Sequence, residues 1–501
     1  MPSREESLTL RDIVRIIGRL PVAERTRTFA QIMADQRETS LDGLLLREVL
    51  TPTDREVTVR ERDGSARAML MFGANDYLGL GNHPYVRERM ADVLRSQGAG
   101  LSGPPLLNGY NALARSLEER LAAYEGKDDA LLFSSGYTAN VGLMSGLPGR
   151  RDTVVYDAHS HASFHDGVRM AGNPTRSFAH NDPAALGAAL SEHRGEGKDD
   201  ALLFSSGYTA NVGLMSGLPG RRDTVVYDAH SHASFHDGVR MAGNPTRSFA
   251  HNDPAALGAA LSEHRGVGKD VFVCVEGVYS MSGDLAPLDQ IATQCRRHDA
   301  LLLVDDAHGT GVAGPLGRGT ATRFGVEDSV TAVMGTFSKS FAVTGGFIAA
   351  DAAVVEYLRF FSRPYMFSSS LPPATLAAVH AGLDILEREP ERHDHLMALC
   401  RYTADGLRAL GHPADERTPI FPIPVPLGMD IRASVHDFHR QGIFLNHIEF
   451  PAVATAEQRF RVSLSAAHTF ADIDRLMEAV EAVWHRHGPQ GDSIPAEPLA
   501  F

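Results

Sequence analysis

Short apolar runs alternate with amphipathic stretches through the middle of the chain. Apolar runs lie within 129–133, 152–157, 271–277 and 301–309, and the stretches that separate them have the spacing of helices. Short runs bounded by turn residues are typical of strands buried in a parallel sheet. Because such strands alternate with helices, the pattern predicts an α/β fold with a mostly parallel sheet covered on both faces.

An internal repeat interrupts this pattern. Residues 125–195 recur without a mismatch as 196–266. Each copy predicts three βα units, and Asp182 or Asp253 is the expected N-cap of the third helix because a proline follows it. A perfect block of this length differs from solenoid repeats of roughly 20–50 residues. We interpret it as a recent duplication or a sequence-assembly error rather than a selected structural duplication.

One sheet needs only one copy of each strand. Either copy, or a hybrid of both, could therefore supply the strands and the site residues that the block carries. We favour the first copy because it follows its single-copy upstream helix and is synthesised first.

The remaining pattern divides the chain into three regions. Residues 1–66 are charged and amphipathic and predict an N-terminal helical arm. Residues 67–355, which contain both copies, predict the large domain. Residues 356–501 combine long helices at 374–387 and 471–487 with short strands, which predicts a smaller α+β C-terminal domain.

Composition narrows the class of protein. The net charge is −14 and no Lys/Arg run stands out, which argues against a nucleic-acid partner. The apolar runs fall far short of the ~20 residues of a membrane helix, and the N-terminus has no signal-peptide core. The three cysteines have no metal-ligand or redox spacing. These features predict a cytoplasmic enzyme without a membrane span or a metal site.

Candidate chemistry begins at Lys339, which follows an apolar strand and stands among small residues. A partly desolvated lysine can form a Schiff base with an aldehyde. Asp305 ends another apolar run, at the edge where parallel sheets bind ligands. A carboxylate there can keep the pyridine nitrogen of pyridoxal phosphate (PLP) protonated. His308, three residues further on, is placed to reach the phenolic oxygen of that ring.

Two further features suit a phosphorylated aromatic cofactor. The turn SSGYTAN, at 134–140 and again at 205–211, joins a strand to a helix N-terminus and predicts a phosphate cradle, with Thr336 as an added hydroxyl. His161 or its duplicate His232 offers a flat ring for stacking on the cofactor. Each feature is weak alone, and their order along the chain is what makes the set informative.

Together the motifs resemble one family, the α-oxoamine synthases, which are PLP enzymes of fold type I. The resemblance extends from 75 to 469 and is carried by FSSGYTAN, EGVYSMSGDLAPL, LLVDDAHGTGVAG and GTFSKSFAVTGG in that order. It implies a large domain with a mostly parallel sheet, a smaller C-terminal domain, and PLP as cofactor.

The resemblance also implies residue roles. Lys339 would bind the cofactor and act as base, Asp305 would pair with the pyridine nitrogen, and His161 or His232 would stack on the ring. The other implied contacts with cofactor and substrate are Gly136 and Tyr137 or Gly207 and Tyr208, Ser280, His308, Thr336, Ser369 from the partner subunit, and Asn75 with Arg461 for the amino-acid carboxylate.

The implied reaction is a decarboxylative Claisen condensation. A small amino acid and an acyl thioester, on CoA or an acyl carrier protein, would give an α-aminoketone and CO₂. Shared sites imply a homodimer. Two alternatives stay open: another fold-type-I enzyme such as a transaminase or lyase, and an inactive homologue damaged by the duplication.

Overall fold

The computed structural model describes residues 10–38, 46–148, 152–157, 160–171, 175–178, 180–183, 185–186, 190, 225–228, 246–249, 271–298, 301–449 and 453–488. Contacts divide the chain into two units. The first unit is Met1–Asn75 with Leu396–Pro498, and the second is Asp76–His395 with Leu499–Phe501. Segments from the two ends of the sequence therefore share the first unit.

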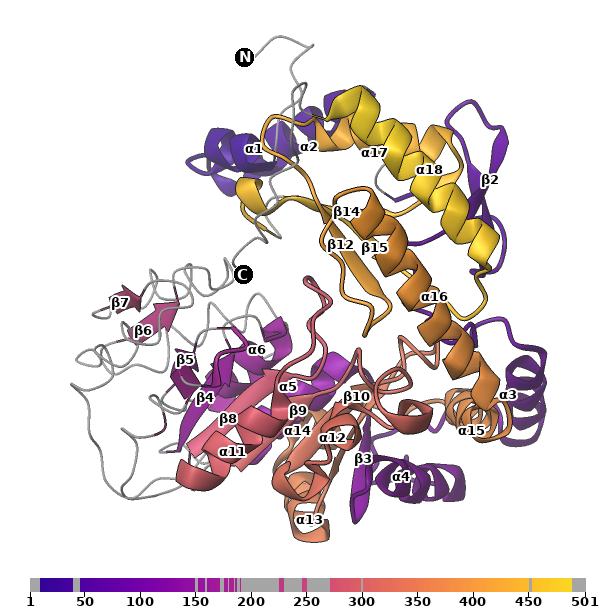
Figure 1. The fold of residues 1–501 in the computed structure, drawn as a ribbon. Helices are drawn as coiled ribbons and strands as arrows, with labels where there is room; N and C mark the ends of the chain where they lie inside the picture. Colours follow the sequence, from indigo (N-terminus) through magenta and orange to yellow (C-terminus); the bar gives the residue numbers. More distant parts are fainter. Residues whose placement is uncertain are drawn as a thin grey trace. The chain divides into compact units, whose positions relative to one another are not determined.

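A seven-stranded mixed sheet forms the centre of the second unit (Figure 1). Its order is β3-β11-β10-β9-β8-β4-β5, and β11 runs antiparallel to both of its neighbours while the other pairs are parallel. The strands are β3 (Asp129–Phe133), β4 (Thr153–Asp157), β5 (Thr175–Phe178), β8 (Val271–Glu276), β9 (Leu301–Asp305), β10 (Ala332–Thr336) and β11 (Gly346–Ala350). They coincide with the apolar runs of the sequence, and the predicted α/β fold is confirmed.

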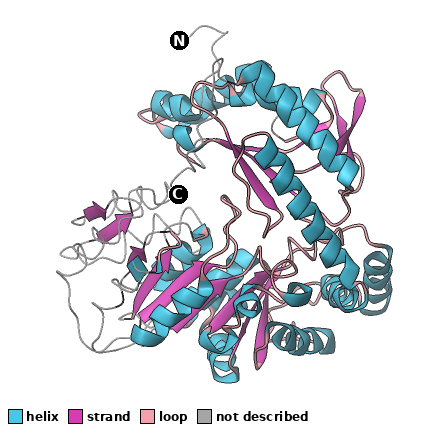
Figure 2. Cartoon of the chain, in the orientation of Figure 1, coloured by secondary structure: helices cyan, strands magenta, loops and turns pink. Residues whose placement is uncertain are grey.

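Helices cover both faces of this sheet, and Figure 2 distinguishes them from the strands by colour. Alternate strand residues face opposite layers: Leu302 and Val304 pack in one apolar cluster and Leu303 in another. One face carries α3 (Pro84–Gln97), α4 (Ala112–Glu125), α11 (Leu288–His298), α12 (Thr320–Phe324) and α15 (Pro373–Arg388). The other carries α5 (Gly136–Gly146), α6 (Ala162–Ala171), α13 (Ala352–Phe361) and α14 (Arg363–Phe367). Burial on both faces explains why the strands are apolar throughout.

The first copy of the repeat supplies β3, β4 and β5 of the main sheet. From the second copy, β6 (Val225–Asp228) and β7 (Thr246–Phe249) pair with each other in a separate two-stranded parallel sheet. Strand β8 follows the second copy in sequence, yet it pairs with β4 of the first. The main sheet is therefore complete without any strand from 196–266.

Deleting 196–266 is expected to preserve the fold and to raise the soluble yield. The deletion removes no strand of the main sheet and leaves 430 of the 501 residues. Exposed apolar strands favour association between chains. Soluble fraction on expression and circular dichroism of the purified chain would measure the effect. Loss of helical signal, or a yield no better than that of the full chain, would contradict this expectation.

The first unit contains two three-stranded sheets. One has the order β1-β2-β13 and the other, antiparallel throughout, the order β12-β15-β14. The strands are β1 (Glu56–Arg60), β2 (Ala66–Met71), β12 (Ile420–Pro424), β13 (Ile443–Phe444), β14 (Asn446–Ile448) and β15 (Arg459–Ser463). The helices are α1 (Leu10–Ile17), α2 (Val22–Glu38), α17 (Ile431–Arg440), α18 (Phe470–His487) and the greater part of α16 (Pro390–Ala409).

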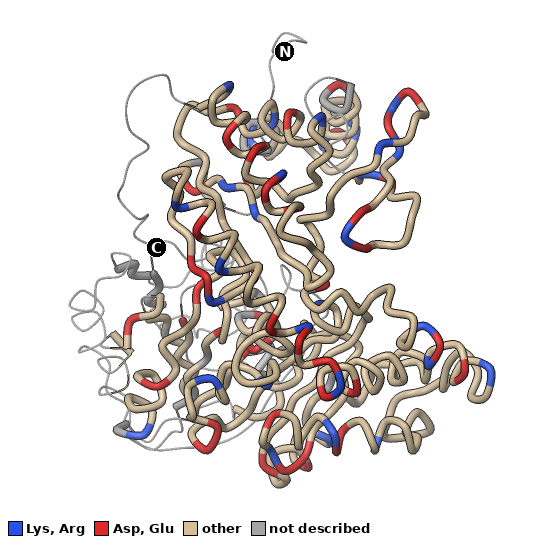
Figure 3. Tube along the Cα trace, turned by 45° about the vertical axis from the view of Figure 1, so that its right-hand side comes forward, with Lys and Arg blue, Asp and Glu red and all other residues tan. Residues whose placement is uncertain are grey.

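Aromatic rings pack between the helices and strands of this unit. Phe460 of β15 lies edge-on to Phe438 of α17 at 5.2 Å and to Trp484 of α18 at 5.7 Å between ring centroids. Figure 3 shows basic and acidic residues interspersed along the described chain. None of the helices within the described ranges is long and apolar enough to cross a bilayer.

Candidate active site

Polar side chains collect at the carboxyl edge of the main sheet. Asp157, Glu276, Asp305 and Thr336 are the last residues of β4, β8, β9 and β10. Strand β3 is parallel to β10, because both are antiparallel to β11, so Ser134 follows at the same edge. The carboxyl ends of parallel strands are where open α/β sheets bind ligands.

Asp305 is held at this edge by donors on both oxygens. It is 2% exposed. Its Oδ1 accepts from the backbone N–H of Ala307 at 3.0 Å, and its Oδ2 accepts from the side-chain amide of Asn140. Burial raises the pKa of Asp305, whereas the Lys339 charge and these hydrogen bonds oppose that rise. The carboxylate is therefore buried and oriented, as a partner for a protonated ring nitrogen must be.

Lys339 is half-buried in a constrained turn after β10. The backbone N–H of Ala342 donates to the Lys339 carbonyl at 2.9 Å, and Ala342 has a left-handed φ of 53°. Left-handed backbone is uncommon for alanine and marks a position held by its surroundings. The Ser340 hydroxyl donates to the Thr310 carbonyl at 2.8 Å and fastens the turn to the loop after β9.

The start of α5 forms a cradle of backbone N–H groups. Ser135 caps the helix and makes a reciprocal capping box with Thr138. A Cβ at Gly136 would lie 2.7 Å from the Cβ of Thr336, and one at Gly346 would lie 2.6 Å from the Gly136 nitrogen. Only glycines fit this approach, and free N–H groups at a helix start suit a phosphate.

Hydroxyls surround the cradle. Thr336 Oγ1 donates to the Gly345 carbonyl at 3.0 Å and lies 3.0 Å from the Ser338 hydroxyl. The Tyr137 hydroxyl donates to Asp166 of α6 at 2.6 Å. The duplicate candidates Gly207, Tyr208 and His232 lie outside the described residues.

The two candidate histidines have defined partners. His308 is buried, and its Nδ1 lies 2.6 Å from the hydroxyl of Tyr77, a fully buried residue. His161 is exposed and its Nδ1 lies 2.7 Å from the Ser163 hydroxyl. Both rings are therefore oriented by neighbouring hydroxyls.

Ser280 lies beside a buried carboxyl group. Its backbone N–H donates to Glu276 Oε2 at 3.3 Å, while no described residue forms a hydrogen bond with Glu276 Oε1. Burial and the neighbouring Asp305 raise the pKa of Glu276 well above its usual range. Burial and the Asp305 charge therefore both favour the protonated form of Glu276.

In the first unit, Arg461 and Asn75 meet. Arg461 Nη1 donates to Asn75 Oδ1 at 3.0 Å and to the Ser463 hydroxyl at 2.9 Å. Arg461 lies in the middle of β15 and is only 6% exposed. A guanidinium is suited to bind a carboxylate through charge-assisted hydrogen bonds.

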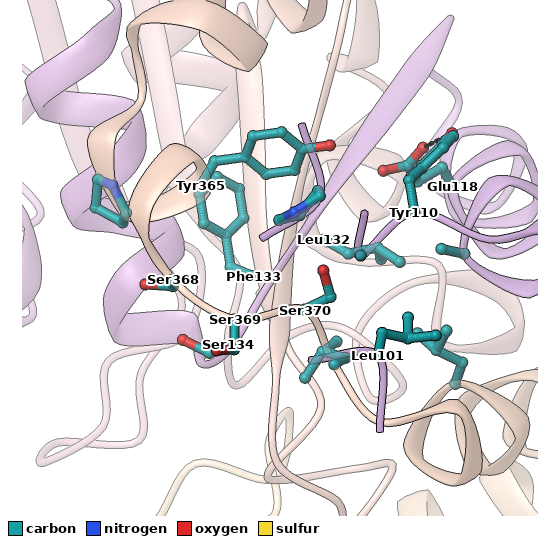
Figure 4. A pocket seen from close by; sticks show the side chains of 16 residues that line it. Leu101, Tyr110, Glu118, Leu132, Phe133, Ser134, Tyr365, Ser368, Ser369 and Ser370 are labelled. Carbon is teal, nitrogen blue, oxygen red and sulfur yellow. Dashed lines mark hydrogen bonds between the residues drawn. The ribbon is translucent and has the colours of Figure 1, made fainter. Parts of the chain in front are cut away.

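Ser369 lies at a pocket of the second unit. Figure 4 shows Ser134, Ser368, Ser369 and Ser370 along it, with Glu118 further back. Apolar walls come from Leu101, Pro105, Leu132, Phe133, Leu371 and Leu376. Burial raises the pKa of Glu118 to about 7 although Arg359 and the Tyr110 hydroxyl stabilise its charge. The pocket is thus apolar with a rim of hydroxyls.

Comparison with known proteins decides the family. The aminotransferase class I and II family matches residues 67–198 and 195–480. The 8-amino-7-oxononanoate synthase of Marinobacter nauticus is 34% identical over 416 residues, which cover 83% of this chain and 87% of that protein. That of Methylococcus capsulatus is 33% identical over 453 residues, covering 90% and 94%.

The chain belongs to the α-oxoamine synthases. Among solved structures, serine palmitoyltransferase of Sphingomonas wittichii aligns with a TM-score of 0.71 and 26% identity over 93% of this chain and 98% of that one. A serine palmitoyltransferase with its PLP internal aldimine aligns with a TM-score of 0.71 and 25% identity over 92% and 98%. This synthase is thus an acyltransferase-type PLP enzyme of fold type I, and the predicted family, fold and cofactor are confirmed.

Three residues at the edge of the synthase's sheet were missed by the sequence reasoning: Tyr77, Asn140 and Glu276. Each stands inside or directly beside a motif that was recognised. In the sequence, each is a polar side chain among residues that are expected to be buried. A buried polar side chain requires a hydrogen-bond partner. The partner itself comes from a distant segment and is visible only in the fold.

The synthase also holds a buried imidazole between two carboxylates. His180 Nδ1 lies 2.9 Å from Asp157 Oδ1, and Nε2 lies 3.0 Å from Asp284 Oδ2. Burial disfavours its charge, but the two carboxylates outweigh burial and raise the pKa of His180 to about 10. This ion triad joins the first copy of the repeat to the single-copy segment after β8.

Replacing His180 with alanine is expected to destabilise the synthase by about 3 kcal/mol, because two carboxylates lose their buried partner. The folded pKa exceeds the unfolded one, so this stabilisation is complete below pH ~6.5 and is lost as pH rises toward about 10. Denaturant melts of His180→Ala and of its duplicate control His251→Ala would measure it. Equal losses in both variants, or no loss in His180→Ala, would refute the assignment.

Proposed function

We propose that this protein catalyses a decarboxylative condensation of a small amino acid with an acyl thioester, giving an α-aminoketone and CO₂. The observation that carries the proposal is the buried Asp305 carboxyl group, which the Ala307 N–H and the Asn140 amide orient at the carboxyl edge of the sheet. The names of the relatives, 8-amino-7-oxononanoate synthase and serine palmitoyltransferase, support this reaction class over a transaminase.

The residues present fit PLP. The start of α5 at Gly136 and Tyr137, with Thr336, would hold the phosphate, Asp305 the pyridine nitrogen, and Lys339 the aldehyde carbon. His308 and Ser280 would contact the phenolic side of the ring, and His161 its face. When bound, PLP supplies an electron sink for negative charge that develops at the amino-acid α-carbon.

The protein's own side chains have separate roles in the reaction. Lys339 Nζ takes the proton from the amino-acid α-carbon and later returns one to the product. Asp305 would stabilise a positive charge on the ring nitrogen. Arg461 and Asn75 hold the amino-acid carboxylate through charge-assisted hydrogen bonds.

We also propose a homodimer in which Ser369 reaches the phosphate site of the partner. Large apolar side chains are exposed in the same part of the second unit: Leu107 is 81% exposed and Phe367 is 70% exposed. Phe360 and Phe361 of α13 are each more than half exposed. Exposed apolar groups of this size are typical of interfaces.

An assay of CO₂ release over a grid of glycine, alanine and serine with acyl-CoA and acyl-carrier thioesters tests the function. We expect release only when both substrates are present, with one amino acid preferred. Thioester-independent transfer of the amino group to an oxo acid would instead identify a transaminase. The carrier arm of the grid decides whether an acyl carrier protein is a partner.

A further inference from the structure

Asp305 and His161 are joined by a continuous line of side-chain hydrogen bonds. The Asn140 amide nitrogen donates to Asp305 Oδ2 and also lies 2.8 Å from the Ser163 hydroxyl. That hydroxyl lies 2.7 Å from His161 Nδ1. The line runs from β9 through α5 to α6, entirely within the second unit. It connects two residues to which different roles toward the cofactor are assigned above.

The direction of every bond in the line follows from one backbone contact. The N–H of Ser163 lies 3.2 Å from His161 Nδ1 and can only donate. Nδ1 therefore accepts, and a neutral His161 carries its proton on Nε2. The Ser163 hydroxyl also donates to Nδ1, which leaves its oxygen to accept from Asn140. Both N–H bonds of the Asn140 amide are thereby used, one toward Asp305 and one toward Ser163.

The orientation of the Asn140 amide leaves an acceptor unused. Asn140 is fully buried, and its Oδ1 has no hydrogen-bond partner among the residues that the structure describes. Rotating the amide would remove the donation to Asp305 and place the Asn140 Oδ1 against the Asp305 carboxylate. An unsatisfied buried acceptor is costly, and this one persists because two donations, one of them to a charged group, depend on it.

We propose that Asn140 is a positioning residue that couples the Asp305 carboxylate to the ring of His161. This proposal rests on the proposed function, in which Asp305 faces the ring nitrogen and His161 stacks on the ring. Through one end Asn140 donates to the Asp305 carboxylate and orients it. Through the Ser163 hydroxyl it fixes the plane of the His161 ring.

The repeat supplies a matched control. Asn211 is the duplicate of Asn140 and has an identical sequence around it on both sides. Leucine is close to asparagine in volume and removes both donors. Asn140→Leu and Asn211→Leu therefore make the same chemical change at two positions of one chain.

The experiment compares these variants in the full-length protein. For Asn140→Leu we expect weaker binding of PLP to the apoprotein and a shifted pH dependence of the cofactor absorbance. The kcat of amino-acid α-proton exchange should fall about 10–100-fold, which is the effect of losing one hydrogen bond to a charged group. The amino-acid KM should change little, because Arg461 and Asn75 are untouched. Asn211→Leu should match the wild type in all four measurements.

A second variant separates positioning from folding. Ser163→Ala removes only the hydroxyl, so PLP binding to the apoprotein should weaken severalfold while the pH dependence set by Asp305 stays in place. Wild-type PLP affinity in Ser163→Ala, wild-type exchange in a folded Asn140→Leu, or equal losses in Asn211→Leu would each overturn the proposal. Failure of the proposed function has a different signature, since the wild-type protein would then show no CO₂ release that depends on the thioester.

Discussion

Lys339→Ala is expected to abolish the absorbance of the lysine–cofactor Schiff base and to slow turnover by about 10²–10⁴-fold or more. The variant loses both the amine that bonds the cofactor and the base that moves the α-proton, and a positioned base alone contributes that much. Absorbance spectra of the purified variant with added PLP and the CO₂-release assay would measure the two effects.

The small number of lysines makes the control unambiguous. The 501 residues contain four: Lys127, Lys198, Lys269 and Lys339. Borohydride reduction followed by peptide mapping should place the cofactor on Lys339 alone. Lys198→Ala should keep the absorbance band, and a band that survives in Lys339→Ala would show that another lysine carries the cofactor.

Asp305→Ala is expected to bind PLP but to exchange the amino-acid α-proton about 10²–10³-fold more slowly. Without the carboxylate, the ring nitrogen loses the group that keeps it protonated, so negative charge at the α-carbon is poorly stabilised. Exchange of the α-proton in deuterated water, followed by NMR, measures this step without the thioester.

The neighbouring Asp306 provides the comparison. Asp306 is also buried, but it accepts from the backbone N–H and the hydroxyl of Thr320, each at 2.7 Å. Burial raises its pKa to about 6. Asp306→Asn should therefore lower the free energy of unfolding while α-proton exchange in the folded protein persists. Near-normal exchange in Asp305→Ala would contradict the assignment of the ring-nitrogen partner.

Local pattern was sufficient to predict most strands of the main sheet and the position of Asp305 at a strand end, whereas β1 lies inside the predicted N-terminal helical arm. Asp305 was placed at the end of its strand because the apolar run 301–304 stops there, and the capping hydrogen bond from Ala185 to Asp182 follows the predicted N-cap. Such features depend on neighbouring residues and leave a periodic or capping signal in the sequence.

Long-range pairing left no such signal. The run at 346–350 is apolar whichever way it points, so its antiparallel placement between β10 and β3 could not be inferred from it. The contact of Tyr77 with His308 joins residues 231 positions apart. Which residue Tyr77 contacts depends on how the whole unit packs, and this packing cannot be inferred from a single sequence.

The pairing of β8 with β4 has a consequence for synthesis on the ribosome. At ~5–20 residues per second, the 71 residues of the second copy delay the arrival of β8 by about 4–14 seconds. During that interval β4 has an open edge, and an identical strand emerges before its partner does. The nascent chain therefore passes through a period of competition between the copies, in which a chaperone that shields strand edges would have its largest effect on yield.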